Sequence, residues 1–169
     1  MADFLPAFEK TLVNEGGYHL TNIKSDRGGQ TYAGIARNPN PQWAGWSYID
    51  HGDTPPAEMV RVFYRQNFWE PLGLTAISSQ QVAQTIYDFA VNAGAGTAAK
   101  LAQIVAGTTP DGKIGQITTA SINAMSGELF CARYALAKLA RYEQIVSRNK
   151  EQGKFLLGWL RRTLKEATA

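Results

Sequence analysis

The chain has 169 residues, of which 44% are hydrophobic and 11% aromatic, so it is able to bury a substantial core and is not a disordered chain. Its formal net charge of +3 and its pI near 9.0 imply a mild attraction to polyanions, which include cell-wall polymers, nucleic acids and anionic membranes alike. The single cysteine, Cys131, excludes an internal disulfide.

The N-terminal residues 1–6 lack the positive region and the continuous apolar run of a secretory signal peptide. No later stretch is long and apolar enough to span a membrane. We therefore expect synthesis in the cytoplasm and no stable insertion into a membrane.

A first helix is predicted to end at Glu15, because apolar residues recur at helical spacing and the pair Gly16-Gly17 supplies a left-handed cap. These apolar residues are Phe4, Leu5, Phe8, Leu12 and Val13. The negative end of the helix dipole favours the protonated form of a carboxylate, which is the form that a general acid requires. Glu15 is therefore a candidate catalytic acid, and the alternative is a solvated residue on a short helix.

The segment 26–35 is rich in glycine and is predicted to form a hairpin or a small irregular sheet. It supplies a second carboxylate, Asp26, and a hydroxyl, Thr31. The hydroxyl has a local alternative role, which is to bond the hairpin backbone. We expect this segment to form one wall of a cleft whose other carboxylate is Glu15.

Three aromatic residues follow the break at residues 38–41, namely Trp43, Trp46 and Tyr48. Flat aromatic faces in a loop serve either as platforms for sugar rings or as anchors that hold the loop on the core. The sequence leaves both roles open.

Two helices are predicted next. The first begins at Thr54-Pro55-Pro56, with a hydroxyl cap, and runs to Trp69. The second is capped by Ser78 or Ser79 and runs to Gly94, and its apolar stripe is typical of a central core helix. Asp88 and Asn92 lie four residues apart on one face of this helix, where they form either a polar rim or part of the cleft.

The second half of the chain is predicted to be helical, with a short helix over 97–105 and a long amphipathic helix over 126–149. The basic residues of the long helix, among them Lys138, are expected on a solvated face. A last amphipathic helix after Gly153 is expected to dock on the body.

Other chemistries find little support in the sequence. The two histidines, His19 and His51, and the single cysteine show no spacing typical of a zinc site, and no phosphate-binding glycine loop is present. We therefore expect no metal or other cofactor, and no nucleic-acid partner.

Two separated motifs occur in order along the chain. The first is Glu15-Gly16-Gly17-Tyr18, and the second comprises Asp26, Gly28-Gly29, Thr31 and Gly34-Ile35. Together they resemble glycoside hydrolase family 108, the N-acetylmuramidases once called secretion-activating proteins. The second half is similar to the peptidoglycan-binding region that accompanies this family, through residues 87–94 and 111–115. The resemblance implies a mainly α, lysozyme-like fold with a small β-hairpin lobe, a catalytic region over 1–92, and a peptidoglycan-binding-like region over 93–169 packed on it as one compact unit.

The resemblance also implies the substrate, which is peptidoglycan, and the roles of the site residues. Glu15 is expected to protonate the glycosidic oxygen between N-acetylmuramic acid and N-acetylglucosamine, while Asp26 and Thr31 hold and activate water. We expect inversion at the anomeric carbon, because Thr31 follows Asp26 in the same turn-rich segment, where its hydroxyl is placed to share a water with the carboxylate. Tyr18 and Tyr32 are candidates for lining the sugar subsites, and Asp88 and Asn92 are further candidates.

Two rival functions stay open. A lytic transglycosylase uses one glutamate and leaves an anhydro sugar end, whereas a noncatalytic wall-binding or secretion-accessory protein leaves the wall uncut. A wall hydrolase without a signal peptide needs another route to its substrate, such as a prophage holin, a secretion pore or lysis. We therefore expect action on the wall in the periplasm or outside the cell.

Overall fold

The computed structural model describes residues 1–22 and 28–167, and this part of the chain is mainly helical, as predicted. The α-helices are α1 (Phe4–Asn14), α2 (Gly45–Asp50), α3 (Ala57–Tyr64), α4 (Gln80–Ala93), α5 (Ala95–Ala106), α6 (Gln116–Asn123), α7 (Gly127–Arg148) and α8 (Gly153–Ala167). The strands are β1 (Leu20–Asn22), β2 (Gln30–Tyr32) and β3 (Ile35–Ala36). None of the helices in the described ranges is long and apolar enough to cross a bilayer.

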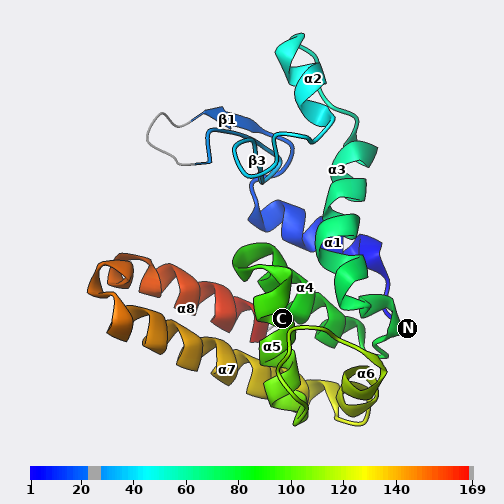
Figure 1. The fold of residues 1–169 in the computed structure, drawn as a ribbon, viewed down its shortest axis with the longest axis vertical. Coiled ribbons are helices and arrows are strands. Elements are labelled where there is room, and N and C mark those ends of the chain that lie inside the picture. Colours follow the sequence, from blue (N-terminus) through cyan, green and yellow to red (C-terminus); the bar gives the residue numbers. More distant parts are fainter. Residues whose placement is uncertain (23–27, 168–169) are drawn as a thin grey trace.

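The three strands form one antiparallel sheet in the order β1-β2-β3, with Thr31 opposite both Thr21 and Ala36. The tight turn between β2 and β3 is Ala33-Gly34, so the predicted hairpin is present. Together with α2, the sheet forms a small lobe on one side of α1 (Figure 1).

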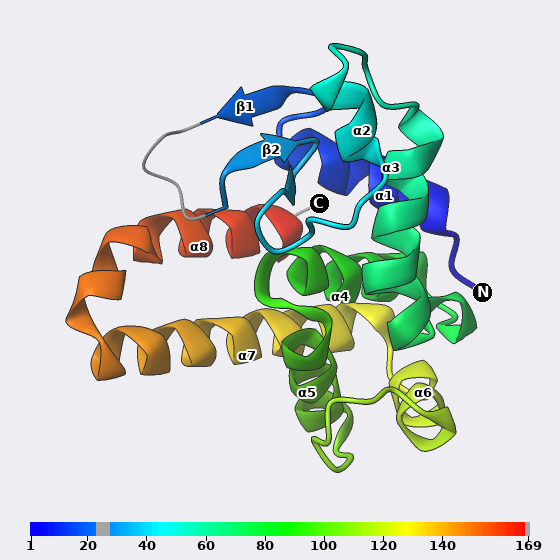
Figure 2. The same ribbon diagram turned by 45° about the horizontal axis from the view of Figure 1, so that its top comes forward.

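Helix α4 lies at the centre of the molecule, in contact with α1, α5 and α7 (Figure 1). The helices α7 and α8 run antiparallel as a long hairpin, and the C-terminal end of α8 returns to the body below β2 (Figure 2). This return brings the last helix beside the first one, which is where the candidate site lies.

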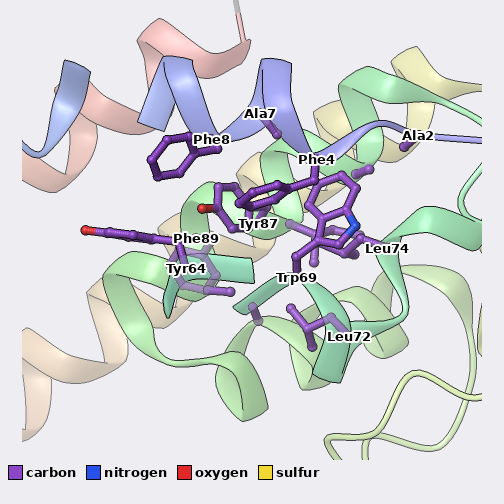
Figure 3. Close-up of a cluster of buried hydrophobic side chains, with 14 of the residues drawn as sticks. Ala2, Phe4, Ala7, Phe8, Tyr64, Trp69, Leu72, Leu74, Tyr87 and Phe89 are labelled. Carbon is purple, nitrogen blue, oxygen red and sulfur yellow. The ribbon is translucent and has the colours of Figure 1, made fainter. Parts of the chain in front are cut away.

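Aromatic side chains fill the core between α1, α3 and α4 (Figure 3). Phe4 packs edge-on against Trp69 and Tyr87, with ring centroids 5.7 and 5.9 Å apart, and Phe8 packs against Tyr64 at 5.6 Å. Edge-to-face pairs of this kind stabilise a core beyond the burial of their area, by about 0.5–1.5 kcal/mol each. The buried cluster continues into the second half of the chain through residues of α5 and α7.

Helix boundaries follow local capping chemistry. The Ser79 and Ser126 hydroxyls accept hydrogen bonds from Val82 N and Leu129 N, and so cap α4 and α7. The Ser79 cap was one of the two predicted from the sequence. The predicted Thr54 cap was wrong, since α3 begins at Ala57 without any side-chain cap. Each residue that precedes a proline is held out of the helical region, so the Pro55-Pro56 pair delays the start.

The predicted solvated face of the long helix was wrong at Lys138, which is only 1% exposed. Its Nζ lies 3.3 Å from the Thr85 hydroxyl and about 5 Å from the ring centroids of Phe89 and Tyr134. A hydroxyl and two aromatic faces compensate the ammonium for part of its lost hydration. Lys138 therefore belongs to the packing between α4 and α7.

Candidate active site

Glu15 is the C-cap residue of α1, one residue past the last helical position. The helix ends in a Schellman arrangement, in which Gly17 N donates to Leu12 O (2.9 Å) and Gly16 N donates to Val13 O (3.3 Å). Both glycines have positive φ, +89° and +72°, which a side chain would disfavour. The glycine pair therefore turns the chain sharply and holds Glu15 at the helix end, as predicted.

The Glu15 side chain lines a cleft of about 270 Å³ between α1, the β2–β3 turn and α3. Aromatic and amide side chains form much of the wall, and they include Asn40, Phe63, Tyr64, Asn67 and Phe68. Asn40, Phe63 and Asn67 also line a second cavity of about 380 Å³, together with Trp43 and Gln66. The shared residues make the two cavities neighbouring sections of one groove.

The β2–β3 turn approaches Glu15 closely, and glycine makes this possible. A Cβ at Gly34, where φ is +78°, would overlap the Tyr64 hydroxyl and lie 3.1 Å from Glu15 Cβ. The Tyr64 hydroxyl donates to the carbonyl of Ala33 (2.9 Å), which itself has a positive φ of 49°. Tyr64 and the turn thus position the cleft wall against the carboxylate.

Glu15 forms an ion pair with an arginine from the other end of the chain. Arg162 on α8 donates from its Nη2 to Glu15 Oε1 (3.2 Å), and it forms a two-pronged pair with Asp88 on α4 at 2.9 and 3.0 Å. Thr11 and Asn14 of α1 also donate to Asp88, at 3.2 and 3.5 Å. Glu15, Asp88 and Arg162 are called the charged triplet below.

The pKa values in this region follow from burial and from these charges. Burial lowers the pKa of Arg162, but the hydrogen bonds and charges of Asp88 and Glu15 raise it above its ordinary value. Burial raises the pKa of Tyr64, and the Glu15 charge raises it further. Arg162 is therefore charged and Tyr64 is a neutral hydroxyl over the working range of a protein.

The structure places the other predicted residues unevenly around this cleft. Asp26 lies outside the described residues. Thr31 is half-buried on β2 and is not among the cleft-lining residues, and its backbone carbonyl accepts a bond from the Thr21 hydroxyl at 3.4 Å. Tyr18 is 40% exposed, just after the glycine pair.

Tyr32 is buried behind the groove, where its ring stacks on Trp43 at a centroid distance of 6.1 Å. Asp88 is also buried, and it binds Arg162 but does not line the Glu15 cleft. Asn92 is exposed near the end of α4. Trp46 is buried and acts as an anchor of its loop, whereas Trp43 lines the groove.

Sequence reasoning missed Arg162, Tyr64 and the amides of the groove wall. Arg162 is separated from Glu15 by 147 positions, and no motif around it marks a site. Tyr64 lies within the helix predicted up to Trp69, but nothing in that pattern shows that its hydroxyl holds the turn beside Glu15. The basic pair Arg161-Arg162 lies in the last predicted amphipathic helix, and a basic pair in such a helix does not by itself indicate a site.

Two family models match the sequence of this chain. The model of the family described as glycosyl hydrolase 108 matches residues 8–94, and that of the family described as "Predicted Peptidoglycan domain" matches residues 97–164. No curated protein matches the sequence.

A solved structure of Brucella abortus SagA resembles the whole chain. The TM-score is 0.66 at 23% sequence identity, and the alignment covers 98% of this chain and 96% of that one. Similarity at this identity shows the fold, which is the mainly α, lysozyme-like fold with a small sheet that was predicted. The first family match covers just over half of the chain, with Glu15 and the glycine turn inside it. The chain therefore belongs to the glycosyl hydrolase 108 family and is a peptidoglycan hydrolase or binder.

Proposed function

We propose that the protein is an N-acetylmuramidase, which hydrolyses the β-1,4 bond between N-acetylmuramic acid and N-acetylglucosamine with Glu15 as the general acid. The observation that carries this proposal is the position of Glu15. Among the described residues that line the cleft of about 270 Å³, it is the one carboxylate, and it is 24% exposed. A general acid must reach the glycosidic oxygen from a partly dry wall of this kind.

The groove beyond Glu15 suits a glycan strand. Amide side chains and aromatic rings both line it, among them Asn67, Phe63, Trp43 and Gln66. Apolar faces with a few placed polar groups are typical of ligand sites, and sugar rings offer both an apolar face and hydroxyls. The linked cavities extend the site from the carboxylate over neighbouring sugars of one strand.

We propose further that Asp26 and Thr31 hold the attacking water, and that the reaction inverts the anomeric carbon. An inverting pair of carboxyl groups is about 6.5–9.5 Å apart, whereas a direct nucleophile lies at about 5–5.5 Å. Analysis of fresh product by proton NMR tests this proposal. An early β-anomer would contradict it and remove Asp26 and Thr31 from the role of activating water.

The remaining residues receive supporting roles in the same proposal. Tyr18 and Asn92 are exposed, and in this proposal they contact the glycan beyond the scissile bond. Tyr32 supports the groove wall rather than contacting the glycan, because it is buried and stacks on Trp43. Asp88 acts through Arg162 rather than on the glycan.

Replacement of Glu15 by glutamine tests the central assignment. The amide is nearly isosteric but delivers no proton, so the rate of wall hydrolysis should fall about a hundredfold to ten-thousandfold. The assay is loss of turbidity of purified sacculi, with mass analysis of the released fragments. Glu9→Gln is the matched control, because Glu9 is exposed on the same helix.

The outcomes separate the three functions. Reducing ends from the wild-type protein and an inactive Glu15→Gln variant are expected for the hydrolase. Anhydro ends would instead identify a lytic transglycosylase. Uncut sacculi that retain the wild-type protein would identify a noncatalytic binder, and full activity of Glu15→Gln would refute the role of Glu15.

A further inference from the structure

The charged triplet joins the two family-matched regions through side-chain ion pairs. Glu15 and Asp88 lie within residues 8–94, and Arg162 lies within residues 97–164. The Arg162 side chain is 24% exposed and that of Asp88 is 4% exposed, so the contact is largely shielded from water. An ion pair in such a place is fixed in geometry to a degree that a surface pair is not.

Asp88, rather than Glu15, fixes the guanidinium. Two bonds of 2.9 and 3.0 Å hold Nε and Nη2 on the Asp88 carboxylate, whereas one bond of 3.2 Å joins Nη2 to Glu15. A two-pronged pair sets both the distance and the plane of the guanidinium. Donors from Thr11 and Asn14 hold Asp88 in turn. The bond from Arg162 Nη2 to Glu15 therefore comes from a guanidinium whose plane Asp88 sets.

The charges of the triplet decide what this support does to Glu15. With Glu15 ionised the triplet carries a net charge of −1, and with Glu15 protonated it is neutral. Arg162 alone would favour the ionised carboxylate, which donates no proton. The Asp88 charge opposes that effect, so the pair orients the carboxylate while its two charges act on Glu15 in opposite directions.

Other ionisable groups face Glu15 from the neighbouring elements. Tyr64 on α3 and Tyr87 on α4 are buried, which is the main cause that raises the pKa of each, and the Glu15 charge adds to it. Both hydroxyls are therefore neutral throughout the range of an activity assay. Lys165 on α8 contacts Asn14 at 3.4 Å, one position before Glu15. Among these groups, Arg162 has a direct hydrogen bond to the Glu15 carboxylate, and Asp88 is the anion that binds Arg162.

We propose that Arg162 and Asp88 are positioning residues for Glu15, with Arg162 orienting the carboxylate and Asp88 both fixing Arg162 and offsetting its charge. The proposal rests on the assignment of Glu15 as the general acid. It gives the second region a part in catalysis, because the arginine that completes the site comes from α8.

Opposite displacements of the pH–activity profile test the proposal in the full-length protein. In Asp88→Asn the arginine charge acts on Glu15 without an offset, so the high-pH limb of kcat should move to lower pH by roughly one unit. In Arg162→Gln the carboxylate loses its cation and faces Asp88, so the limb should move to higher pH by a similar amount. In both variants kcat at the optimum should fall, by about tenfold or more, because the orientation of Glu15 is lost.

Two further variants sharpen the result. Arg162→Lys keeps the charge but lacks the planar fork, so it should keep the limb near its wild-type position while recovering only part of kcat. Arg161→Gln removes the adjacent exposed arginine of the same helix, and it should leave the position of the high-pH limb and the value of kcat unchanged. Thermal unfolding of every variant separates a folding defect from a site defect.

A shift of both variants in the same direction, or a wild-type profile for Arg162→Gln, would overturn the proposal. If Asp88→Asn does not fold, the comparison of Arg162→Gln with Arg162→Lys decides alone, because equal profiles for the two would also overturn it. These failures differ from a failure of Glu15 itself, which would show as full activity in Glu15→Gln.

Discussion

Replacement of Gly34 by alanine should damage both the stability and the activity of the protein, because the β2–β3 turn has no room for a Cβ. The added atom would overlap the Tyr64 hydroxyl and lie 3.1 Å from Glu15 Cβ. The backbone there has a φ of +78°, which is itself unfavourable for alanine. The change therefore combines a backbone cost with a steric cost at the site.

The size of each cost follows from the structure. The left-handed backbone costs alanine about 1–2 kcal/mol. Displacement of Tyr64 breaks its buried bond to Ala33 O, and an unsatisfied buried group costs about 1–3 kcal/mol more. The free energy of unfolding should therefore fall by about 2–5 kcal/mol. A shift of Glu15 by a few tenths of an ångström to about 1 Å should lower kcat roughly ten- to a hundredfold.

Urea unfolding and sacculus hydrolysis measure the two effects, with Gly52→Ala as the matched control. Gly52 has a similar φ of +84°, but nothing lies within 4 Å of its added Cβ, so only the backbone cost applies. The difference between the two variants isolates the cost of crowding. Equal losses of stability, or an active Gly34→Ala variant, would refute the close approach of the turn to Glu15.

Two further predictions concern the groove and the second half of the chain. Trp43→Ala should raise KM for soluble glycan fragments about tenfold with little change in kcat, because Trp43 lines the groove away from Glu15. The control is Tyr48→Ala, which should leave KM unchanged because Tyr48 lines neither cavity. Asp111→Asn should lower the free energy of unfolding at pH 7, since bonds from the Gln103 side chain and the Lys113 backbone hold the pKa of Asp111 below its ordinary value. A lowered folded-state pKa stabilises the protein at pH values above the unfolded pKa of about 4. The difference in unfolding free energy between the variant and wild type should therefore disappear as the pH falls from about 4 through the lower folded-state pKa of Asp111. A difference that persists in acid would contradict the carboxylate as its cause.

Local chemistry explains why much of the fold was predictable from the sequence. The end of α1 at Glu15 follows from a glycine pair that forms a left-handed cap whatever surrounds it. The start of α4 follows from one serine hydroxyl that bonds a nearby backbone N–H. Such interactions span a few residues, so their pattern is visible in the order of the amino acids.

The composition of the site was predictable only in part, because side chains gather there from distant segments. Sequence spacing placed Asp88 on one face of a helix, but it did not tell a polar rim from a buried partner of Arg162. Lys138 was misassigned for the same reason, since the faces of two packed helices decide which lysine is buried. A single-helix pattern contains no information on what covers each face.

The sequence by itself determined the end of α1, the start of α4, the hairpin with its glycine turn, and the carboxylate held at the end of the first helix, because each depends on neighbours in the chain. Only the tertiary structure decided that the turn and Tyr64 close on Glu15, and that Arg162 meets Glu15 across 147 positions. Those contacts exist because α8 folds back along α7 onto α1 and α4, and burial of Asp88 then requires a cation at that place.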